Sequence, residues 1–227
     1  MLRRYRDFTQ SAPENASAYA ALGTSPDGVP VVVVICFYNG AVADGERLLR
    51  PLRDFGPPVA DTVQPMPYAA LQQMLDPLNP PGNRVYWKSA VLRDIGDDAL
   101  GAVLDHAAAA PSPLSSALLE FYGGVANRVG AQDTAYPLRD AVSALNAVST
   151  WTDPGQDAAN VRWSRGLWEA ARPFSPGSVY VSFIGADEGE DRVRAAYGAN
   201  YDRLAAIKAE YDPDNLFRLN QNIPPAG

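Results

Sequence analysis

A run of β-branched and aromatic residues, VVVVICFY at residues 31–38, lies between two turn sequences, DGVP and NG. Such side chains suit the pleated surface of a sheet, and turn residues on both sides end the run. We therefore predict a buried strand over residues 27–40. A chain with such a strand must supply neighbouring strands and a second layer to cover the sheet.

Apolar residues recur along the rest of the chain with a period of two in some segments and near 3.6 in others. Strands are predicted over residues 84–92, 111–124 and 177–185, with another within 134–151. Helices are predicted over residues 44–56, with Asp44 as a possible N-cap, 67–76, 96–110, 157–174 and 187–212, the last interrupted near Gly198. Residues 1–10 are typical of the exposed end of an amphipathic helix. This order predicts an α+β fold: a largely antiparallel sheet with helices packed on one face, then a C-terminal helical segment and an extended tail.

Composition excludes several classes of protein. The chain has 227 residues, of which 47% are hydrophobic, enough for one sizeable core. A net charge of −7 argues against nucleic acid as a partner. One cysteine, Cys36, and one histidine, His106, leave no internal disulfide and no expected zinc or iron–sulfur site. No stretch approaches the ~20 apolar residues of a membrane span, and no hydrophobic region follows the basic start, so we expect no membrane partner and a cytoplasmic location.

The familiar catalytic and nucleotide motifs are missing from the sequence. No GxGxxG follows a strand and no P-loop is present, so the chain has no phosphate-binding motif of its own. Cys36 lies in an apolar strand, which favours an inert buried thiol, and His106 lies in an alanine-rich helix, which favours a structural role. The acidic clusters at residues 94–98 and 187–191 precede helices, where first-turn charges are favourable; we prefer this interpretation to an acid–base pair.

The C-terminal third carries a dense pattern at fixed spacing. After the aromatic sequence YVSF the chain continues as YGANYDRLAAIKAEYDPDNLFRLNQNIPP. This pattern resembles the C-terminal segment of FAD-linked oxidases of the berberine-bridge-enzyme type. Upstream, the glycine pair of EFYGG and the aromatic-Pro-x-Arg sequence YPLR resemble the same family, so the resemblance covers essentially the whole chain. The matched C-terminal positions are Tyr180, Phe183, Tyr197, Asn200, Arg203, Leu204, Lys208, Asp212, Pro213, Asn215, Phe217, Gln221, Ile223, Pro224 and Pro225.

The resemblance implies a division of the chain and a cofactor. Residues 1–178 resemble the substrate-binding domain, and residues 179–227 resemble the segment that returns to an N-terminal FAD-binding domain, which nothing here matches. FAD is the implied cofactor, but we do not expect this chain to bind it well alone; the FAD-binding domain would come in cis or as a separate subunit. The implied function is the substrate-domain part of an FAD-dependent oxidoreductase, which oxidises a small organic substrate by hydride transfer to flavin and is inactive alone.

The family's usual proton acceptors are replaced in this sequence. The tyrosine base of the family falls on Phe183, which cannot accept a proton, and its asparagine neighbour falls on Ser182. A carboxylate used by plant members would fall on Leu145, and a histidine often seen in the aromatic-Pro-x-Arg motif falls on Leu138. The standard base is therefore absent at each of these positions.

Three sources of a base stay open: another group of this chain, the FAD-binding domain, or a reaction that needs little help from a base. Within the chain the candidates are Tyr180, Tyr122 and Glu120. Glu120 and Tyr122 share one side of their strand because side chains alternate with a period of two. Packing in the core is an equally open interpretation of Tyr180.

Asn200 is the main candidate for contact with the flavin, because an amide both donates and accepts hydrogen bonds at ring heteroatoms. Tyr201, Ser182 and Phe183 are further candidates. The rest of the tail, YDPDNLF, is typical of a helix stop, a turn and an aromatic plug that fix its path. Two alternatives to an oxidoreductase remain: a non-catalytic module that binds a small molecule or a partner, and an inactive fragment without the FAD-binding domain.

Overall fold

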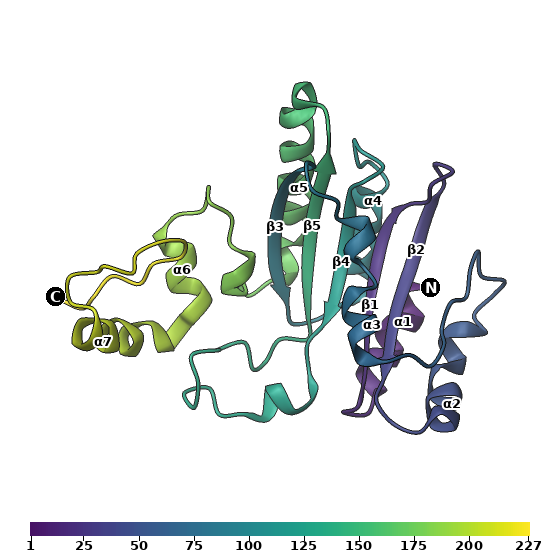
Figure 1. Ribbon diagram of the computed structural model, residues 1–227, viewed down its shortest axis with the longest axis horizontal. Coiled ribbons are helices and arrows are strands. Elements are labelled where there is room, and N and C mark those ends of the chain that lie inside the picture. The colour runs from purple at the N-terminus through teal and green to yellow at the C-terminus, as the bar shows by residue number, and fades with distance from the viewer.

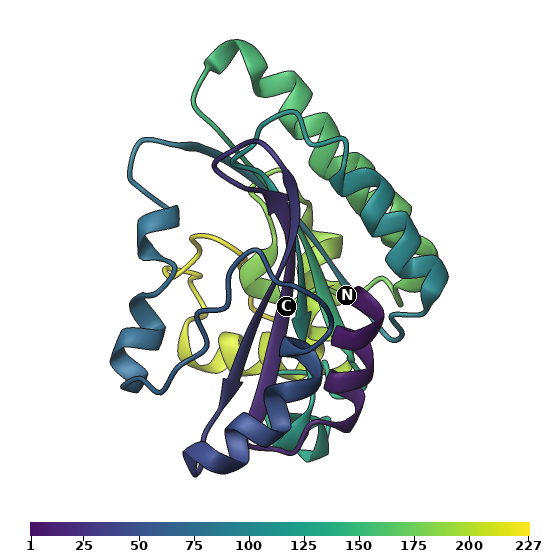
Figure 2. The same ribbon diagram turned by 90° about the vertical axis from the view of Figure 1, so that its right-hand side faces the viewer.

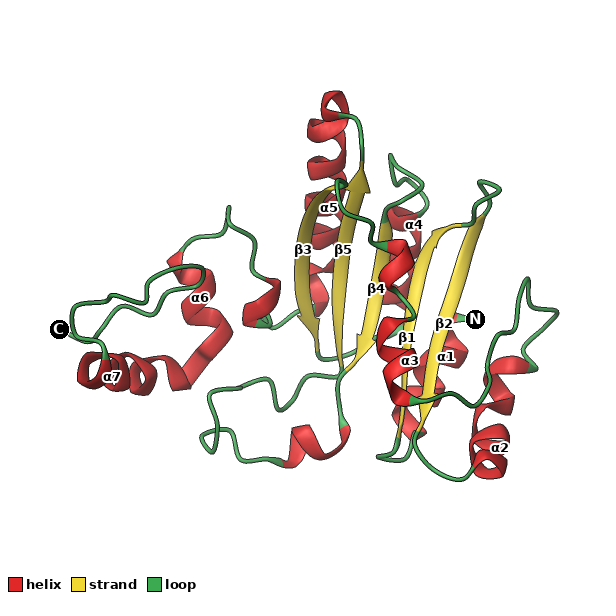
Figure 3. Ribbon diagram, viewed as in Figure 1, coloured by secondary structure: helices red, strands yellow, loops and turns green.

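The computed structural model describes all of residues 1–227, and its centre is an antiparallel sheet of five strands (Figure 1; strands are yellow in Figure 3). The order across the sheet is β2-β1-β4-β5-β3, and every neighbouring pair is antiparallel. The predicted α+β class with a largely antiparallel sheet is therefore confirmed. The strands are β1 (Ala16–Thr24), β2 (Pro30–Tyr38), β3 (Arg84–Leu92), β4 (Ser116–Phe121) and β5 (Ser143–Trp151).

The helices divide between the two sides of the sheet. They are α1 (Leu2–Ser11), α2 (Val42–Arg53), α3 (Tyr68–Gln73), α4 (Asp97–Ala107), α5 (Asp157–Ala171), α6 (Glu190–Tyr197) and α7 (Tyr201–Tyr211). Figure 2 shows α4 and α5 on one side of the sheet and α3 on the other. We call the side away from α1, α4 and α5 the open face. None of the helices combines the length and the apolar character needed to cross a bilayer.

The main core lies between the sheet and α1, α4 and α5. Small side chains of β1, such as Ala18 and Ala20, point to this side and leave room for Tyr5 and Phe8 of α1. Tyr5 is fully buried, and its hydroxyl donates a hydrogen bond to the carbonyl oxygen of Leu119, 2.9 Å away. Helix α1 is therefore part of the core, whereas the sequence predicted an exposed helix end; its apolar stripe packs inward.

Strand β1 is missing from the sequence prediction because its alanines favour helix, and pairing with β2 and β4 overrides that preference. Strand β2 is half-exposed rather than buried, because it is an edge strand with β1 as its one neighbour. Asp44 lies inside the first turn of α2, and Ala41 is the N-cap. Three predicted strands are confirmed, at residues 84–92 and within 111–124 and 134–151. The helices predicted between residues 44 and 174 are confirmed as well.

The prediction of a strand over residues 177–185 is wrong. This segment is irregular, with a 3₁₀ turn at Val181–Phe183. Its backbone makes a single hydrogen bond to the sheet, from the Val91 amide to the Ser178 carbonyl oxygen at 3.3 Å. The segment passes the edge of the sheet and contacts it through side chains instead of forming a ladder. The predicted break near Gly198 is confirmed, because Gly198 has a φ of 51° between α6 and α7.

The C-terminal residues form a second, small cluster beside β3 (Figure 1), built on Val179, Val193 and Tyr201. The tail after α7 is held by polar contacts: Asp212 pairs with Lys208 and accepts from the amide of Leu216 at 2.8 Å. Phe217 is 78% exposed, so the predicted aromatic plug is wrong for this chain. Its backbone, not its ring, fixes the path of the tail, because the Phe217 carbonyl accepts from Lys208.

Candidate functional site

All five strands place aromatic or polar side chains on the open face, and in four of them such side chains lie next to one another. These side chains are Tyr19 of β1, Glu120 of β4, Asn146 of β5 and Trp87 of β3. Their neighbours in each strand point to the helices, because side chains of a strand alternate between faces. The open face carries the short helix α3 and no layer like that of α4 and α5 (Figure 2). A ligand can therefore reach Tyr19, Glu120 and Trp87, which keep exposed surface, whereas Asn146 is fully buried between its partners.

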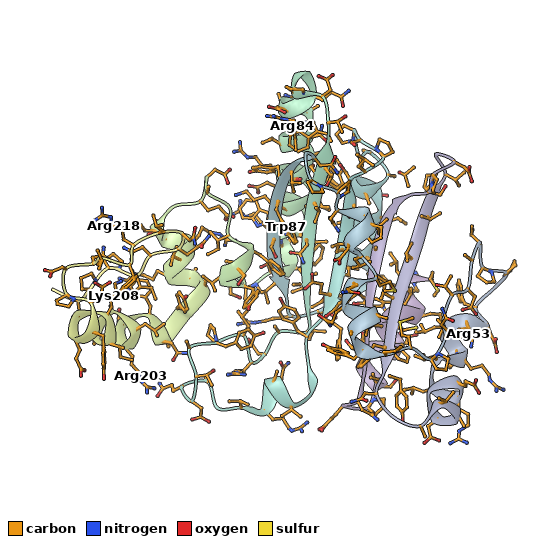
Figure 4. The ribbon with its side chains drawn as sticks, in the orientation of Figure 1. Arg53, Arg84, Trp87, Arg203, Lys208 and Arg218 are labelled. Atoms are coloured by element: carbon orange, nitrogen blue, oxygen red, sulfur yellow. The ribbon has the colours of Figure 1, made fainter.

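Three of these residues form a line of hydrogen bonds across the sheet. The indole Nε1–H of Trp87 donates to Oδ1 of Asn146 at 3.0 Å, and Nδ2 of Asn146 donates to Oε1 of Glu120 at 2.8 Å. Asn146 has no exposed surface, so both ends of its amide are fixed by these partners. No group of the chain donates to the second carboxylate oxygen of Glu120, Oε2. Figure 4 labels Trp87 at the side of the sheet nearest the C-terminal segment.

Electrostatic conditions on the open face favour neutral side chains. Burial raises the pKa of the Glu120 carboxyl, and the hydrogen bond from Asn146 offsets part of that rise. Burial also raises the pKa of the Tyr122 phenol, and the charge of Glu120 adds to the effect. The pKa of Tyr19 is raised by burial first, then by Glu120 and Tyr68. A carboxylate with a raised pKa holds a proton more tightly, which suits a general base.

The three catalytic candidates predicted from the sequence lie on the same side of the sheet. Tyr122 and Tyr180 both pack against the small cluster around Val91, and the charge of Glu120 reaches Tyr122. The Tyr180 ring meets Tyr136 edge-on at 6.0 Å between centroids. Tyr180 is thus half-buried in an aromatic group that borders the open face, and its catalytic role stays a prediction.

The four flavin candidates do not form a single site in this chain. Phe183 stacks on Trp87 with 5.2 Å between ring centroids, and Ser182 is exposed. Asn200 is 5% exposed, and its amide donates to the carbonyl oxygens of Ala131 at 2.8 Å and Thr134 at 3.2 Å. Tyr201 packs in the C-terminal cluster, where the guanidinium of Arg194 lies 3.9 Å from its ring centroid. Contacts of these residues with a flavin therefore stay predictions.

Sequence reasoning missed Trp87, Tyr19 and Asn146. Tyr19 lies in the unpredicted strand β1. Asn146 follows Leu145, the position that the family resemblance indicated, and Leu145 is 1% exposed under the helices. Adjacent residues of a strand point to opposite faces. Leu145 therefore points to the helices, and Asn146 beside it places its amide on the open face. One signal was available: Asn146 is the one amide in the otherwise small and apolar run AVSALNAV.

The residues of the open face fit part of FAD. Aromatic rings and a hydrogen-bonded carboxylate suit a substrate and the ring system of a flavin. No glycine-rich turn leads into a helix beside them to hold a pyrophosphate. Two cavities, of about 480 and 470 Å³, lie at the C-terminal tail and at the start of β3, and neither is lined by Trp87, Asn146 or Glu120.

Three comparisons connect this geometry with known proteins. Residues 179–224 match the family model described as berberine and berberine like. The FAD-linked oxidoreductase YgaK of Bacillus subtilis, itself uncharacterized, is 31% identical over 193 residues, which are 83% of this chain and 42% of that protein. The chain spans less than half the length of the first curated relatives that it matches, between 42% and 44%.

Solved structures share the fold of the whole chain. Berberine bridge enzyme, solved as a single-residue variant in complex with (S)-reticuline, covers 100% of this chain with 52% of its own, at a TM-score of 0.83 and 18% identity. A glycopeptide hexose oxidase in complex with teicoplanin covers 99% of this chain with 51% of its own, at a TM-score of 0.73 and 18% identity. The resemblance to berberine-bridge-enzyme-like FAD-linked oxidoreductases is thus confirmed: the chain carries the family's C-terminal domain and is similar to its members along its length.

Proposed function

We propose that the chain is the substrate-binding side of an FAD-dependent oxidoreductase that oxidises a small organic molecule by hydride transfer to flavin. The observation that carries the proposal is the line from Trp87 through Asn146 to Glu120 at the centre of the open face. The similarity to FAD-linked oxidoreductases supports it. The FAD-binding domain is supplied in cis or by a separate subunit, because this chain has no phosphate-binding motif of its own.

Glu120 is the proposed general base. Oxidation of a CH–OH or CH–NH group removes a hydride from carbon and a proton from the heteroatom, and FAD, when bound, accepts the hydride. Oε1 of Glu120 is occupied by Asn146, which leaves Oε2 for the substrate proton. The raised pKa of Glu120 strengthens it as a base, and the Trp87–Asn146 hydrogen bond fixes the amide that orients it.

The surroundings of Glu120 provide an apolar wall. Around the hydrogen-bonded line of Trp87, Asn146 and Glu120, open-face positions are occupied by the apolar residues Val33, Leu118 and Val148. The phenols of Tyr19 and Tyr122 flank the Glu120 carboxylate. An apolar surface of this kind excludes water from a closed site and strengthens hydrogen bonds inside it. No lysine or arginine stands on the open-face positions of the five strands, so no cation of the sheet competes for Glu120.

The first test is FAD binding by the chain alone, measured by flavin fluorescence during titration. We expect weak or absent binding, because the pyrophosphate has no site. Stoichiometric FAD that stays with the chain through gel filtration would contradict the proposal that FAD is bound by another domain.

The second test pairs the chain with an FAD-binding domain taken from the Bacillus subtilis relative, by fusion or co-expression. A panel of sugars, phenolic amines and polyketides is mixed anaerobically with the complex, and bleaching of the flavin absorbance is followed. We expect one class to bleach the flavin, and Glu120→Gln to slow this step at least tenfold with flavin content unchanged. Equal rates for the two proteins would exclude Glu120 as the base.

A non-catalytic binding module is the second candidate, favoured by the apolar residues Phe183 and Leu138 at positions where the family resemblance places proton acceptors. Binding of a panel compound without bleaching, in a complex whose flavin dithionite still reduces, would support this candidate.

A further inference from the structure

Two adjacent residues of β3, Trp87 and Lys88, contact the same short segment of chain from opposite faces of the sheet. We call this segment, residues 183–188, the edge strap. On the open face the Phe183 ring stacks on Trp87, with 19° between the ring planes. On the helix-covered face Nζ of Lys88 lies 3.2 Å from Oε1 of Glu188. Between these contacts the strap crosses the β3 backbone closely, since a Cβ added to Gly185 would lie 3.7 Å from the Trp87 carbonyl oxygen.

Buried charges hold the strap at its second end. The side chains of Lys88 and Glu188 are 9% and 5% exposed, and Arg192 of α6 pairs with the other oxygen of Glu188 at 2.8 Å. The strap's Asp187 accepts from the Tyr86 hydroxyl at 2.7 Å. A buried charge that loses its partner is costly, so this arrangement leaves the strap little freedom.

The open-face end of the strap touches the proposed catalytic line. Phe183 covers one side of the Trp87 indole. The indole N–H donates a hydrogen bond to Asn146, which in turn donates to Glu120. If Phe183 leaves, the indole is free to turn and to release Oδ1 of Asn146. The Asn146 amide then has no fixed orientation, and Glu120 loses its donor.

We propose that Lys88 is a positioning residue: by holding the edge strap, it keeps Phe183 on Trp87 and thereby fixes the hydrogen bond from Asn146 to Glu120. This inference rests on the proposed function in one respect, the role of Glu120 as the general base. The polar groups that face Glu120 are Asn146 of β5, Tyr19 of β1 and Tyr122 just after β4, and its charge also reaches Tyr5 of α1. Lys88 points to the other face, so it acts on Glu120 through the strap.

The experiment compares Lys88→Met with Arg84→Met in the full chain. Arg84 is a matched control: it lies on the same face of the same strand and binds Asp157 through two hydrogen bonds of 2.6 Å, but it does not contact the strap. Two signals are followed by NMR: the Trp87 indole N–H, assigned with Trp87→Phe, and the ¹³C titration of the Glu120 carboxyl, assigned with Glu120→Gln.

For Lys88→Met we expect the Trp87 indole signal to shift or broaden and the Glu120 titration midpoint to move to higher pH, because the Asn146 hydrogen bond lowers the pKa of Glu120. Arg84→Met leaves both signals in place, and Lys88→Arg restores them. A folded Lys88→Met chain with both signals unchanged overturns the proposal, as does an equal change in Arg84→Met.

If Lys88→Met does not fold, Phe183→Ala removes the open-face contact of the strap without disturbing the buried charges. The same two shifts are expected, and their absence overturns the proposal. Neither signal needs flavin or substrate. A failure of Glu120 as a base would appear in the activity of Glu120→Gln in the FAD-containing complex, while the coupling to Lys88 would stay measurable.

Discussion

Tyr19 of β1 stands directly opposite Glu120 of β4 in the antiparallel ladder, on the open face. The charge of Glu120 disfavours the ionised form of Tyr19: burial is the first cause of the raised pKa of this phenol, and Glu120 adds to it. The pair therefore carries a proton on the phenol over the whole physiological range, and the carboxyl is the group whose charge changes first with pH.

The stability of the chain should depend on pH through Glu120. Its pKa is raised on folding, so the folded state binds the proton more tightly, and the favourable contribution at low pH is lost as pH rises through the folded pKa. Glu120→Gln should therefore increase the free energy of unfolding at about pH 8 and change it little at about pH 4. Urea unfolding at both values measures this, with Glu210→Gln on the exposed side of α7 as a control for net charge. A loss of stability at the higher pH would contradict the prediction.

Removal of the Lys88 charge should destabilise the fold. Lys88→Met leaves Glu188 buried with Arg192 as its remaining charged partner and the Gly185 amide as a neutral donor, so we expect a loss of about 3 kcal/mol, at the low end for a broken buried pair. Arg84→Met breaks a solvent-exposed pair on the same strand and should cost clearly less. Chemical denaturation of the two variants side by side measures the difference, and equal losses would show that Glu188 is not held by Lys88.

Asn200 should hold the loop before the YPLR sequence in place. Its amide donates to the carbonyl oxygens of Ala131 and Thr134, so Asn200→Ala removes two hydrogen bonds, at about 1 kcal/mol each. We expect faster hydrogen exchange at residues 129–136 and unchanged exchange in β5. The control is Asn79→Ala, which removes a comparable bond to the carbonyl of Leu75 in an exposed turn. Unchanged exchange in the loop would leave Asn200 free for another role, such as contact with the flavin.

The Tyr5 hydroxyl should contribute to the packing of α1 on the sheet. Tyr5→Phe removes the hydrogen bond to Leu119 and leaves a buried carbonyl with one partner fewer, so we expect a loss of about 1 kcal/mol. Tyr211→Phe, at a position that is mostly exposed, should leave the free energy of unfolding unchanged. Thermal unfolding of both variants is sufficient, and an unaffected Tyr5→Phe protein would exclude this contribution.

Local sequence signals predict the elements whose own residues decide their structure. The β-branched run of β2, the strand at residues 84–92 and the break at Gly198 are all visible in the sequence. The failures concern partners that are distant in sequence. Strand β1 is alanine-rich and exists because β2 and β4 lie on either side of it, whereas residues 177–185 have the composition of a strand but pass the sheet edge without a ladder.

The same limit applies to the candidate site. Period two places Glu120 and Tyr122 on one side of the sheet, but which face stays open depends on where α1, α4 and α5 pack. The resemblance leads to Leu145, and Asn146 beside it is the residue that reaches Glu120. The strap contacts of Lys88 join residues about a hundred positions apart, which no periodicity in the sequence reports.

The edge strap has a second consequence, for solubility. Outer strands of a sheet expose unpaired amide and carbonyl groups that can recruit another chain and start aggregation. At β3 the strap covers this edge with Phe183 on one side and Glu188 on the other, and adds buried charge that an incoming strand would have to displace. The opposite edge, the β-branched strand β2, has no such cover from a C-terminal segment. Aggregation of this chain through its sheet should therefore begin at the edge strand β2. Release of the strap should expose a second strand edge, that of β3, to pairing with another chain.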